Sequence, residues 1–120
     1  MDDVIDPCRA WIEAALEHGG NTHTFEDVKQ GILEGRMQLW PAEDGCCVTE
    51  IVVYPRKKVL SGFLAGGDLS RVIDMIPDIE AWAVAHGCAA AEITGRRGWV
   101  RAFGPIGYRE AATNIRKELA

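Results

Sequence analysis

The chain has 120 residues, of which 48% are hydrophobic and 26% charged, and its 13 Lys+Arg against 18 Asp+Glu give a formal net charge of -5. This composition is that of one globular domain, which we place at residues 1–120. The acidic balance argues against a protein that binds nucleic acid or an anionic membrane, and no apolar run is long enough to span a bilayer. The N-terminus is acidic, unlike that of a signal peptide, so we expect a cytoplasmic protein.

The sequence contains four cysteines, which are Cys8, Cys46, Cys47 and Cys88. No two of them have the CxxC spacing, and the three histidines show no ligand spacing to them, so we expect no metal site. Cys46 and Cys47 are adjacent in a strand-like run, and their side chains should therefore point to opposite faces. We interpret all four as small buried residues in a reducing compartment.

Two helices are predicted at the start of the chain. Asp6-Pro7 has the residue types of an N-cap and a first helical position, and Gly19-Gly20 ends this helix. Its apolar residues recur at helical spacing, at Cys8, Trp11, Ile12, Ala15 and Leu16. Thr24 followed by Asp27 predicts a capping-box-like start for the second helix, which Gly35 stops.

Three strands are predicted next, because the hydrophobic period changes from helical to alternating. Residues 36–40 alternate as a half-buried strand does, and residues 46–54 are rich in β-branched side chains. Residues 58–65 are predicted to be the hairpin partner of the second strand, after a turn at residues 55–57.

A long helix is predicted after Gly66-Gly67, with Asp68 as its cap and Gly87 as its stop. Pro77 lies inside the helical pattern and should kink or split the helix, because proline lacks an N–H and clashes with the preceding turn. Residues 89–94 are predicted to form a short strand of small residues, central in the sheet and covered on both faces.

The remaining elements are a short helix over residues 97–103 and two final strands over residues 108–113 and 115–119, the last of which also has helical propensity. The predicted order is therefore ααβββαβαββ. Strands on both sides of the long helix favour one βαβ crossover in an otherwise antiparallel sheet. The expected fold class is α+β, with a mixed, mostly antiparallel sheet of about six strands flanked by helices.

Residues 79–87, which include Glu80, Ala83 and Gly87, have the pattern Leu-Glu-x-x-Ala-x-x-x-Gly with isoleucine in first place. This segment is similar to the end of the long helix in the GNAT acetyltransferases. Residues 96–108 resemble in spacing that family's Asn-x-x-Ala-x-x-x-Tyr-x-x-x-Gly-Phe segment. The element order resembles the family over most of the chain, and the residue-level similarity covers residues 79–120.

The resemblance implies an acetyl-CoA site, in which a Gln/Arg-x-x-Gly-x-Gly/Ala loop presents N–H groups to the pyrophosphate at a helix N-terminus. Residues 64–71 do not fit this pattern in any register, and Asp68 would place a carboxylate beside the phosphates. The tyrosine that protonates the leaving thiolate in the family corresponds here to Phe103, which has no proton to give. Arg96 stands at the position of the family's asparagine.

The resemblance thus implies a GNAT-like scaffold whose cofactor loop and acid are altered. Short GNAT-like proteins with a Gly-Arg-x-Gly-Trp segment, here residues 95–99, look like proteins of tailed phages and prophages, some of which are virion or ejection components. We expect a phage-related, non-catalytic protein without a cofactor, in the host cytoplasm or within a phage particle. It would act through a protein partner, and a second copy of itself is one such partner.

Arg96, Arg97 and Arg101, with Trp99 between them, form a basic and aromatic cluster that we predict to bind the partner. Guanidinium groups bind phosphates or carboxylates in a forked geometry, and tryptophan often anchors protein interfaces. The alternative is structural: Trp99 packs under the short helix, and the arginines pair with surface carboxylates.

The alternative function is a divergent acyl-CoA-dependent N-acetyltransferase. Such an enzyme would need a different pyrophosphate cradle, built from Gly66, Gly67 and arginines such as Arg96. Glu50, in the middle strand, would be its general base if it faces a water-filled cleft. Otherwise Glu50 is an exposed or ion-paired strand carboxylate, and we expect no catalytic residue.

Overall fold

The computed structural model describes residues 2–120. Its first helical layer comprises α1 (Asp2–Ile5), the 3-10 turn η1 (Asp6–Cys8), α2 (Arg9–His18) and α3 (Phe25–Leu33). The prediction that Asp6 caps the first helix is wrong. The backbone is already right-handed helical at Ile5 and stays so at Cys8, because the ring of Pro7 fixes a φ that a helix accepts.

The start and the end of α3 are confirmed. The Thr24 hydroxyl accepts a hydrogen bond of 3.2 Å from the Asp27 N–H, and the Asp27 carboxylate accepts one of 2.9 Å from the Thr24 N–H. This reciprocal pair satisfies two of the N–H groups that a helix N-terminus leaves free. Gly35 follows the helix with a φ of +81°, a conformation that glycine adopts at little cost.

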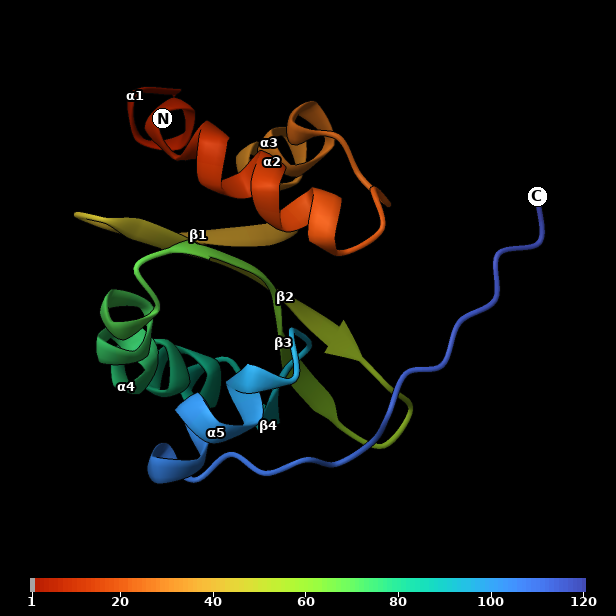
Figure 1. Cartoon of the computed structure of the whole chain (residues 1–120). Coiled ribbons are helices and arrows are strands. Elements are labelled where there is room, and N and C mark those ends of the chain that lie inside the picture. The colour runs from red at the N-terminus through yellow and green to blue at the C-terminus, as the bar shows by residue number, and fades with distance from the viewer. Residues whose placement is uncertain (1) are drawn as a thin grey trace.

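Four strands form one sheet in the order β1-β2-β3-β4 (Figure 1). They are β1 (Met37–Ala42), β2 (Gly45–Val53), β3 (Lys58–Gly67) and β4 (Cys88–Ile93). The first three pair antiparallel, whereas β3 and β4 pair parallel and are joined by α4 (Leu69–Ala85). The predicted βαβ crossover is therefore confirmed.

The prediction for the end of the chain is wrong in two respects. After α5 (Gly98–Phe103) and the 3-10 turn η2 (Gly104–Ile106), residues 109–120 run extended and exposed, so neither final strand forms and the sheet has four strands, not six. Since no strand follows it, β4 is an edge strand and not a central one, and its residues Ala89, Ala90 and Glu92 are exposed.

Pro77 does not split the long helix, because α4 runs without interruption from Leu69 to Ala85. Buried residues on both sides of the proline hold the helix against the sheet, and the Pro77 side chain itself is exposed. These buried residues are Val72, Ile76, Ile79 and Ala83. Their burial outweighs the one backbone hydrogen bond that proline removes.

The sheet separates two hydrophobic cores. Helices α1 to α3 cover one face, where Cys8, Cys46 and Val48 are buried, and α4 with α5 covers the other, where Cys47 and Leu60 are buried (Figure 1). The prediction that Cys46 and Cys47 point to opposite faces is confirmed. No helix among residues 2–120 is long and apolar enough to cross a membrane, and no three metal-ligand side chains gather in that range.

Candidate functional site

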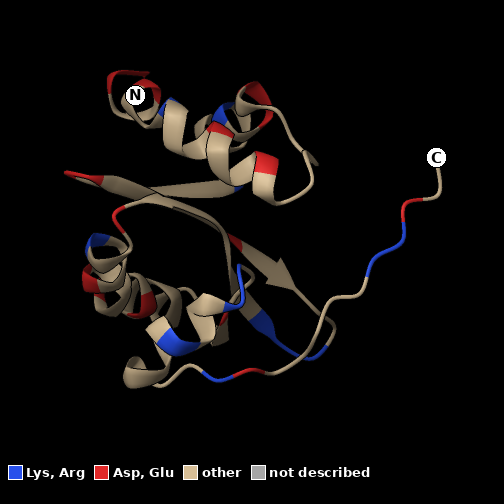
Figure 2. Ribbon diagram, in the orientation of Figure 1, with Lys and Arg blue, Asp and Glu red and all other residues tan. Residues whose placement is uncertain are grey.

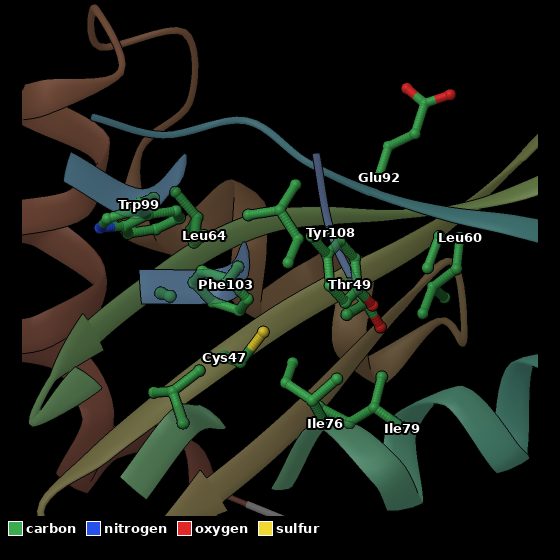
Figure 3. A pocket seen from close by; sticks show the side chains of 15 residues that line it. Cys47, Thr49, Leu60, Leu64, Ile76, Ile79, Glu92, Trp99, Phe103 and Tyr108 are labelled. Carbon is green, nitrogen blue, oxygen red and sulfur yellow. The ribbon is translucent and has the colours of Figure 1, made fainter. Parts of the chain in front are cut away.

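A cleft lies where β3 and β4 diverge. The two strands pair from Lys58 with Cys88 as far as Gly62 with Ile93, and β3 then continues without β4 to Gly67. Helix α4 lies under the cleft, and α5 closes its mouth (Figure 3). The apolar lining comes from both strands and both helices, and includes Leu60, Leu64, Val72, Ile76, Ile79, Ala91, Ile93, Trp99 and Phe103.

Aromatic side chains of α5 fill this cleft. The rings of Trp99 and Phe103 have centroids 5.8 Å apart, and Tyr108 packs edge-on against Phe103 at 5.7 Å. Phe103 is only 3% exposed. The enclosed space that remains is about 20 Å³, which is room for about one water molecule.

Two hydroxyl groups that line the cleft, those of Thr49 and Tyr108, are already engaged. The Thr49 hydroxyl donates to the Gln38 side-chain oxygen at 2.8 Å and accepts from the Trp40 indole at 2.9 Å. The Tyr108 hydroxyl donates to the Glu80 carboxylate at 2.7 Å. Burial and, second, this contact with Glu80 raise the pKa of Tyr108 well above its usual value. Within residues 2–120, every buried side-chain nitrogen or oxygen has a hydrogen-bond partner.

Tyr108 and Glu80 are the pair at this site that sequence reasoning did not connect. The signal was Gly107, whose φ of +98° turns the chain sharply after η2. This turn brings Tyr108 back against α4, where Glu80 lies, in place of the strand start that the sequence predicted.

The N-terminus of α4 carries two carboxylates, those of Asp68 and Asp44, and the guanidinium of Arg71. The Asp68 carboxylate accepts hydrogen bonds from the Ser70 hydroxyl at 2.7 Å and from the Ser70 N–H at 3.0 Å, and these lower the pKa of Asp68. The N–H groups of Arg71 and Val72 donate to the Asp68 carbonyl. The Asp44 carboxylate lies 3.8 Å from the Arg71 guanidinium, so a second carboxylate stands near this end of the helix.

Gly66 and Gly67 belong to the paired part of β3, opposite Cys46 and Gly45 of β2. A Cβ on Gly66 would lie 2.8 Å from the Trp11 carbonyl oxygen, because α2 packs closely against β3 at this point. Gly67 has a φ of +85°, and a Cβ on it would overlap the Asp44 carbonyl oxygen. Both glycines are therefore required by the packing of the chain against itself.

The predicted basic cluster is divided between two sides of α5. Trp99 points into the cleft and is half-buried in the core (Figure 3), whereas Arg96, Arg97 and Arg101 are exposed. Figure 2 shows basic positions on α5 and on the chain that leads into it. Within residues 2–120, no carboxylate forms an ion pair with any of these arginines. Trp99 therefore packs under the short helix, as the structural alternative predicted. The arginines, in contrast, do not pair with surface carboxylates of the described residues. Arg97 and Arg101 border a shallow surface depression together with Gly98 and Val100.

Glu50 lies on the opposite face of the sheet from the cleft. Its neighbours in the strand, Cys47 and Thr49, line the α4 side, whereas Glu50 pairs with Met37, which is buried in the core under α3. Because side chains alternate along a strand, Glu50 points to the α3 side. The fold does not bring Glu50 together with Gly66, Gly67 or Arg96.

No family model and no curated protein matches this sequence. Solved structures do match it. A probable acetyltransferase aligns with a TM-score of 0.70 at 11% identity, over 98% of this chain and 93% of its own. A Trypanosoma brucei acetyltransferase aligns with a TM-score of 0.63 at 13% identity, over 92% of this chain and 94% of its own. A possible acetyltransferase from Clostridium difficile 630 aligns with a TM-score of 0.63 at 10% identity, over 100% of this chain and 93% of its own.

These identities are too low to transfer an activity, and fold alone does not imply function. The alignments nevertheless cover nearly the whole length of both partners in each case. The chain therefore has a GNAT-like acetyltransferase fold.

Proposed function

We propose that this chain is a GNAT-like protein that does not use acetyl-CoA and acts through contacts with another protein. The observation that carries the proposal is the state of residues 66–68. Gly66 and Gly67 are hydrogen-bonded into the sheet, and Asp68 caps the helix that follows them. A pyrophosphate-binding loop of the family's kind would need the backbone N–H groups of these residues to be free for the phosphates.

The charges at the same place support this proposal. A helix N-terminus attracts an anion through its free N–H groups and its dipole. Here the carboxylate of Asp68 already accepts the Ser70 N–H, and Asp44 stands nearby. Because the Asp44 carboxylate is paired with the Arg71 guanidinium, the Asp68 carboxylate is the charge that would repel a pyrophosphate. The cost of bringing these like charges together is larger where water is excluded. The residues present therefore do not fit the phosphate groups of acetyl-CoA.

The closed cleft supports the same conclusion. A space of about 20 Å³ cannot admit a ligand of the size of acetyl-CoA. The side chain at the position of the family's acid, Phe103, is buried and has no exchangeable proton. The hydroxyl beside it, that of Tyr108, donates to Glu80.

The surface that we propose for the partner is the outer side of α5. Arg97 and Arg101 are one helical turn apart and present guanidinium groups to solvent beside Val100, which is 46% exposed. Trp99 contributes by holding the helix from beneath and not by touching the partner. Such a surface is suited to acidic side chains on a partner protein, since guanidinium groups bind carboxylates with two hydrogen bonds.

The phage-related setting stays a prediction from the sequence resemblance, and so does a location in the host cytoplasm or in a particle. The genes on either side of this one test the prediction directly. Neighbouring genes for tail or capsid proteins would support it, and neighbours of ordinary metabolism would contradict it.

The deciding experiment is a titration of the purified protein with acetyl-CoA, followed by calorimetry and by thermal shift, with free CoA as competitor. We expect no saturable binding up to millimolar cofactor and no rise in melting temperature, because a ligand of the folded state would raise it by mass action. Micromolar binding that free CoA competes away would overturn the proposal. It would favour the alternative function, the divergent acyl-CoA-dependent N-acetyltransferase.

The partner surface is tested by capture from the source organism with two matched variants. Arg97→Glu with Arg101→Glu reverses the charge of α5, and Arg56→Glu with Lys57→Glu makes the same change at the exposed turn between β2 and β3. We expect the α5 variant to lose a protein that both the wild type and the turn variant retain. Equal retention by both variants would contradict the assignment of this surface.

A further inference from the structure

The outer edge of β4 is open. β4 pairs with β3 on one side, and within residues 2–120 no strand pairs with its other side. Three consecutive alanines, residues 89–91, leave the backbone of this edge poorly shielded, and Ala89, Ala90 and Glu92 are exposed. Natural edge strands are usually protected by proline, lysine or a covering segment, and here Glu92 is the one charged residue of the strand.

The segment 109–120 is an extended chain without backbone partners. All of its residues are exposed, and none of its backbone groups forms a hydrogen bond with another described backbone group. In an extended chain Ile115 and Leu119 lie on the same side, together with Lys117 between them. Ile115 is 90% exposed and Leu119 is 89% exposed, which leaves two large apolar side chains in water.

The same segment leads away from the β4 edge of its own chain. Tyr108 is fixed to α4 by its hydrogen bond with Glu80. Further along, the Arg116 guanidinium lies against Gly20, in the connection between α2 and α3 on the other side of the sheet. The tail therefore passes the end of the sheet and continues out into solvent (Figure 1).

We propose that residues 109–120 of one copy add as a strand to the β4 edge of a second copy, and that the second tail does the same in return. The proposal goes beyond the proposed function and does not depend on whether acetyl-CoA binds. Addition of an extended segment to an open edge satisfies the backbone groups of both strands. Because the exchange is symmetric, each contact forms twice in the dimer.

Length and charge fit this arrangement. Twelve extended residues reach about 40 Å at roughly 3.3 Å per residue, and the six residues of β4 span only about half of that. The remaining residues serve as the connection between the two copies. The segment carries three basic residues, Arg109, Arg116 and Lys117, against Glu110 and Glu118. Opposite charges on neighbouring strands would stabilise a pairing of one of these basic residues with the carboxylate of Glu92.

The test is the molar mass in solution, measured by light scattering over a range of protein concentrations. We expect twice the 13.2 kDa of one chain at high concentration. Ile115→Pro removes a backbone donor and a large apolar side chain that strand addition would cover, and should weaken the dimer about tenfold or more. Ile115→Val is the matched control and should stay dimeric. Because Ile115 is exposed in the single chain, neither variant should change the melting temperature of the monomer.

The edge itself is tested by Ala90→Lys, with Ala81→Lys on the exposed side of α4 as its control. A lysine at the edge should weaken the dimer, and the same residue on α4 should not. A single-chain mass at every concentration would overturn the proposal, and so would a dimer that Ile115→Pro leaves intact. Hydrogen-exchange protection of residues 109–120 in a monomer would also overturn it, since the tail would then pair within its own chain.

Discussion

The indole ring of Trp99 lies so close to Gly95 that a Cβ on Gly95 would overlap it. Gly95 has no positive φ, so the position requires glycine for space and not for backbone conformation. This contact links the connection after β4 with α5. It fixes the orientation in which α5 turns Trp99 into the cleft and Arg97 and Arg101 toward solvent.

Gly95→Ala should therefore lower the free energy of unfolding by about 1–3 kcal/mol, as overpacking of a formed core does. The measurement is urea unfolding of the variant beside the wild type. Gly98→Ala is the control, because nothing lies within 4 Å of a Cβ at that position, and it should stabilise α5 by about 0.5–1 kcal/mol. Equal stability of Gly95→Ala and the wild type would mean that Trp99 does not rest on Gly95 in solution.

Gly66→Ala tests whether glycine is required at this position by the packing of α2 against β3 or by a bound ligand. Its Cβ would lie 2.8 Å from the Trp11 carbonyl oxygen and 2.9 Å from the Trp11 Cβ, so α2 would have to move away from β3. We expect a loss of about 1–3 kcal/mol in urea unfolding. Gly104→Ala, where a Cβ meets nothing within 4 Å, should lose much less. A well-tolerated alanine at Gly66 would contradict the packing role and reopen the question of a bound ligand.

The elements that sequence predicts correctly are those with local signals. Thr24 and Asp27 form a capping box within four residues, and Gly35 and Gly87 end their helices with positive φ. The last two strands were not predictable from sequence alone, because strand formation in residues 109–120 depends on pairing with a distant partner. The same non-local dependence explains why β4 was expected to be central and lies at the edge.

At the candidate site, sequence indicated the right segment but not its orientation. Trp99, Ala102 and Phe103 are spaced so that one side of a helix is apolar, and this pattern places the arginines on the other side. Sequence could not show that Gly66 faces Trp11, because that contact joins α2 to β3 across the fold. Nor could it show that Glu50 points away from the cleft, which follows from the register of β1 with β2.

Tyr108 should make the protein sensitive to alkaline pH. Burial, and then the Glu80 carboxylate, raise the pKa of Tyr108 above its ordinary value of 10.0, so the folded state holds the phenolic proton more tightly than the unfolded state does. The stability that Tyr108 contributes in this way is complete below about pH 10 and is lost as the pH rises toward the raised pKa of Tyr108. Tyr108→Phe should cost about 1 kcal/mol at neutral pH, because it removes the hydrogen bond to Glu80.

The measurement is the melting temperature of both proteins from neutral pH to above pH 10. The wild type should lose stability more steeply than Tyr108→Phe in the alkaline range. Burial raises the pKa of Cys47 from 9.0 to about 12, so this thiol adds to the alkaline loss of both proteins. Cys47 also raises the pKa of Tyr108, so the difference between the two curves reports Tyr108 together with its coupling to Cys47. Parallel curves would contradict a raised pKa at Tyr108.

Asp68 should have the opposite effect at acid pH. Hydrogen bonds from the Ser70 hydroxyl and N–H lower the pKa of Asp68 below its ordinary 3.8, so the folded state favours the carboxylate. The stability that this cap contributes is present above the ordinary pKa of aspartate and is lost as the pH falls through the lowered pKa of Asp68. Asp68→Asn keeps a good cap without a titrating group, so it should change stability little at neutral pH and lose less of it in acid.

The measurement is urea unfolding of the wild type and Asp68→Asn from neutral pH to below pH 3.8. Asp27, whose pKa is also lowered by its contacts with Thr24, titrates in both proteins and serves as the internal control. A smaller acid loss in the variant would mean that Asp68 keeps its negative charge at the start of α4 at neutral pH, where it repels phosphate groups. Identical acid losses would mean that the Ser70 contacts do not hold this carboxylate, and the electrostatic argument against acetyl-CoA would then fail, because Asp44 is paired with Arg71.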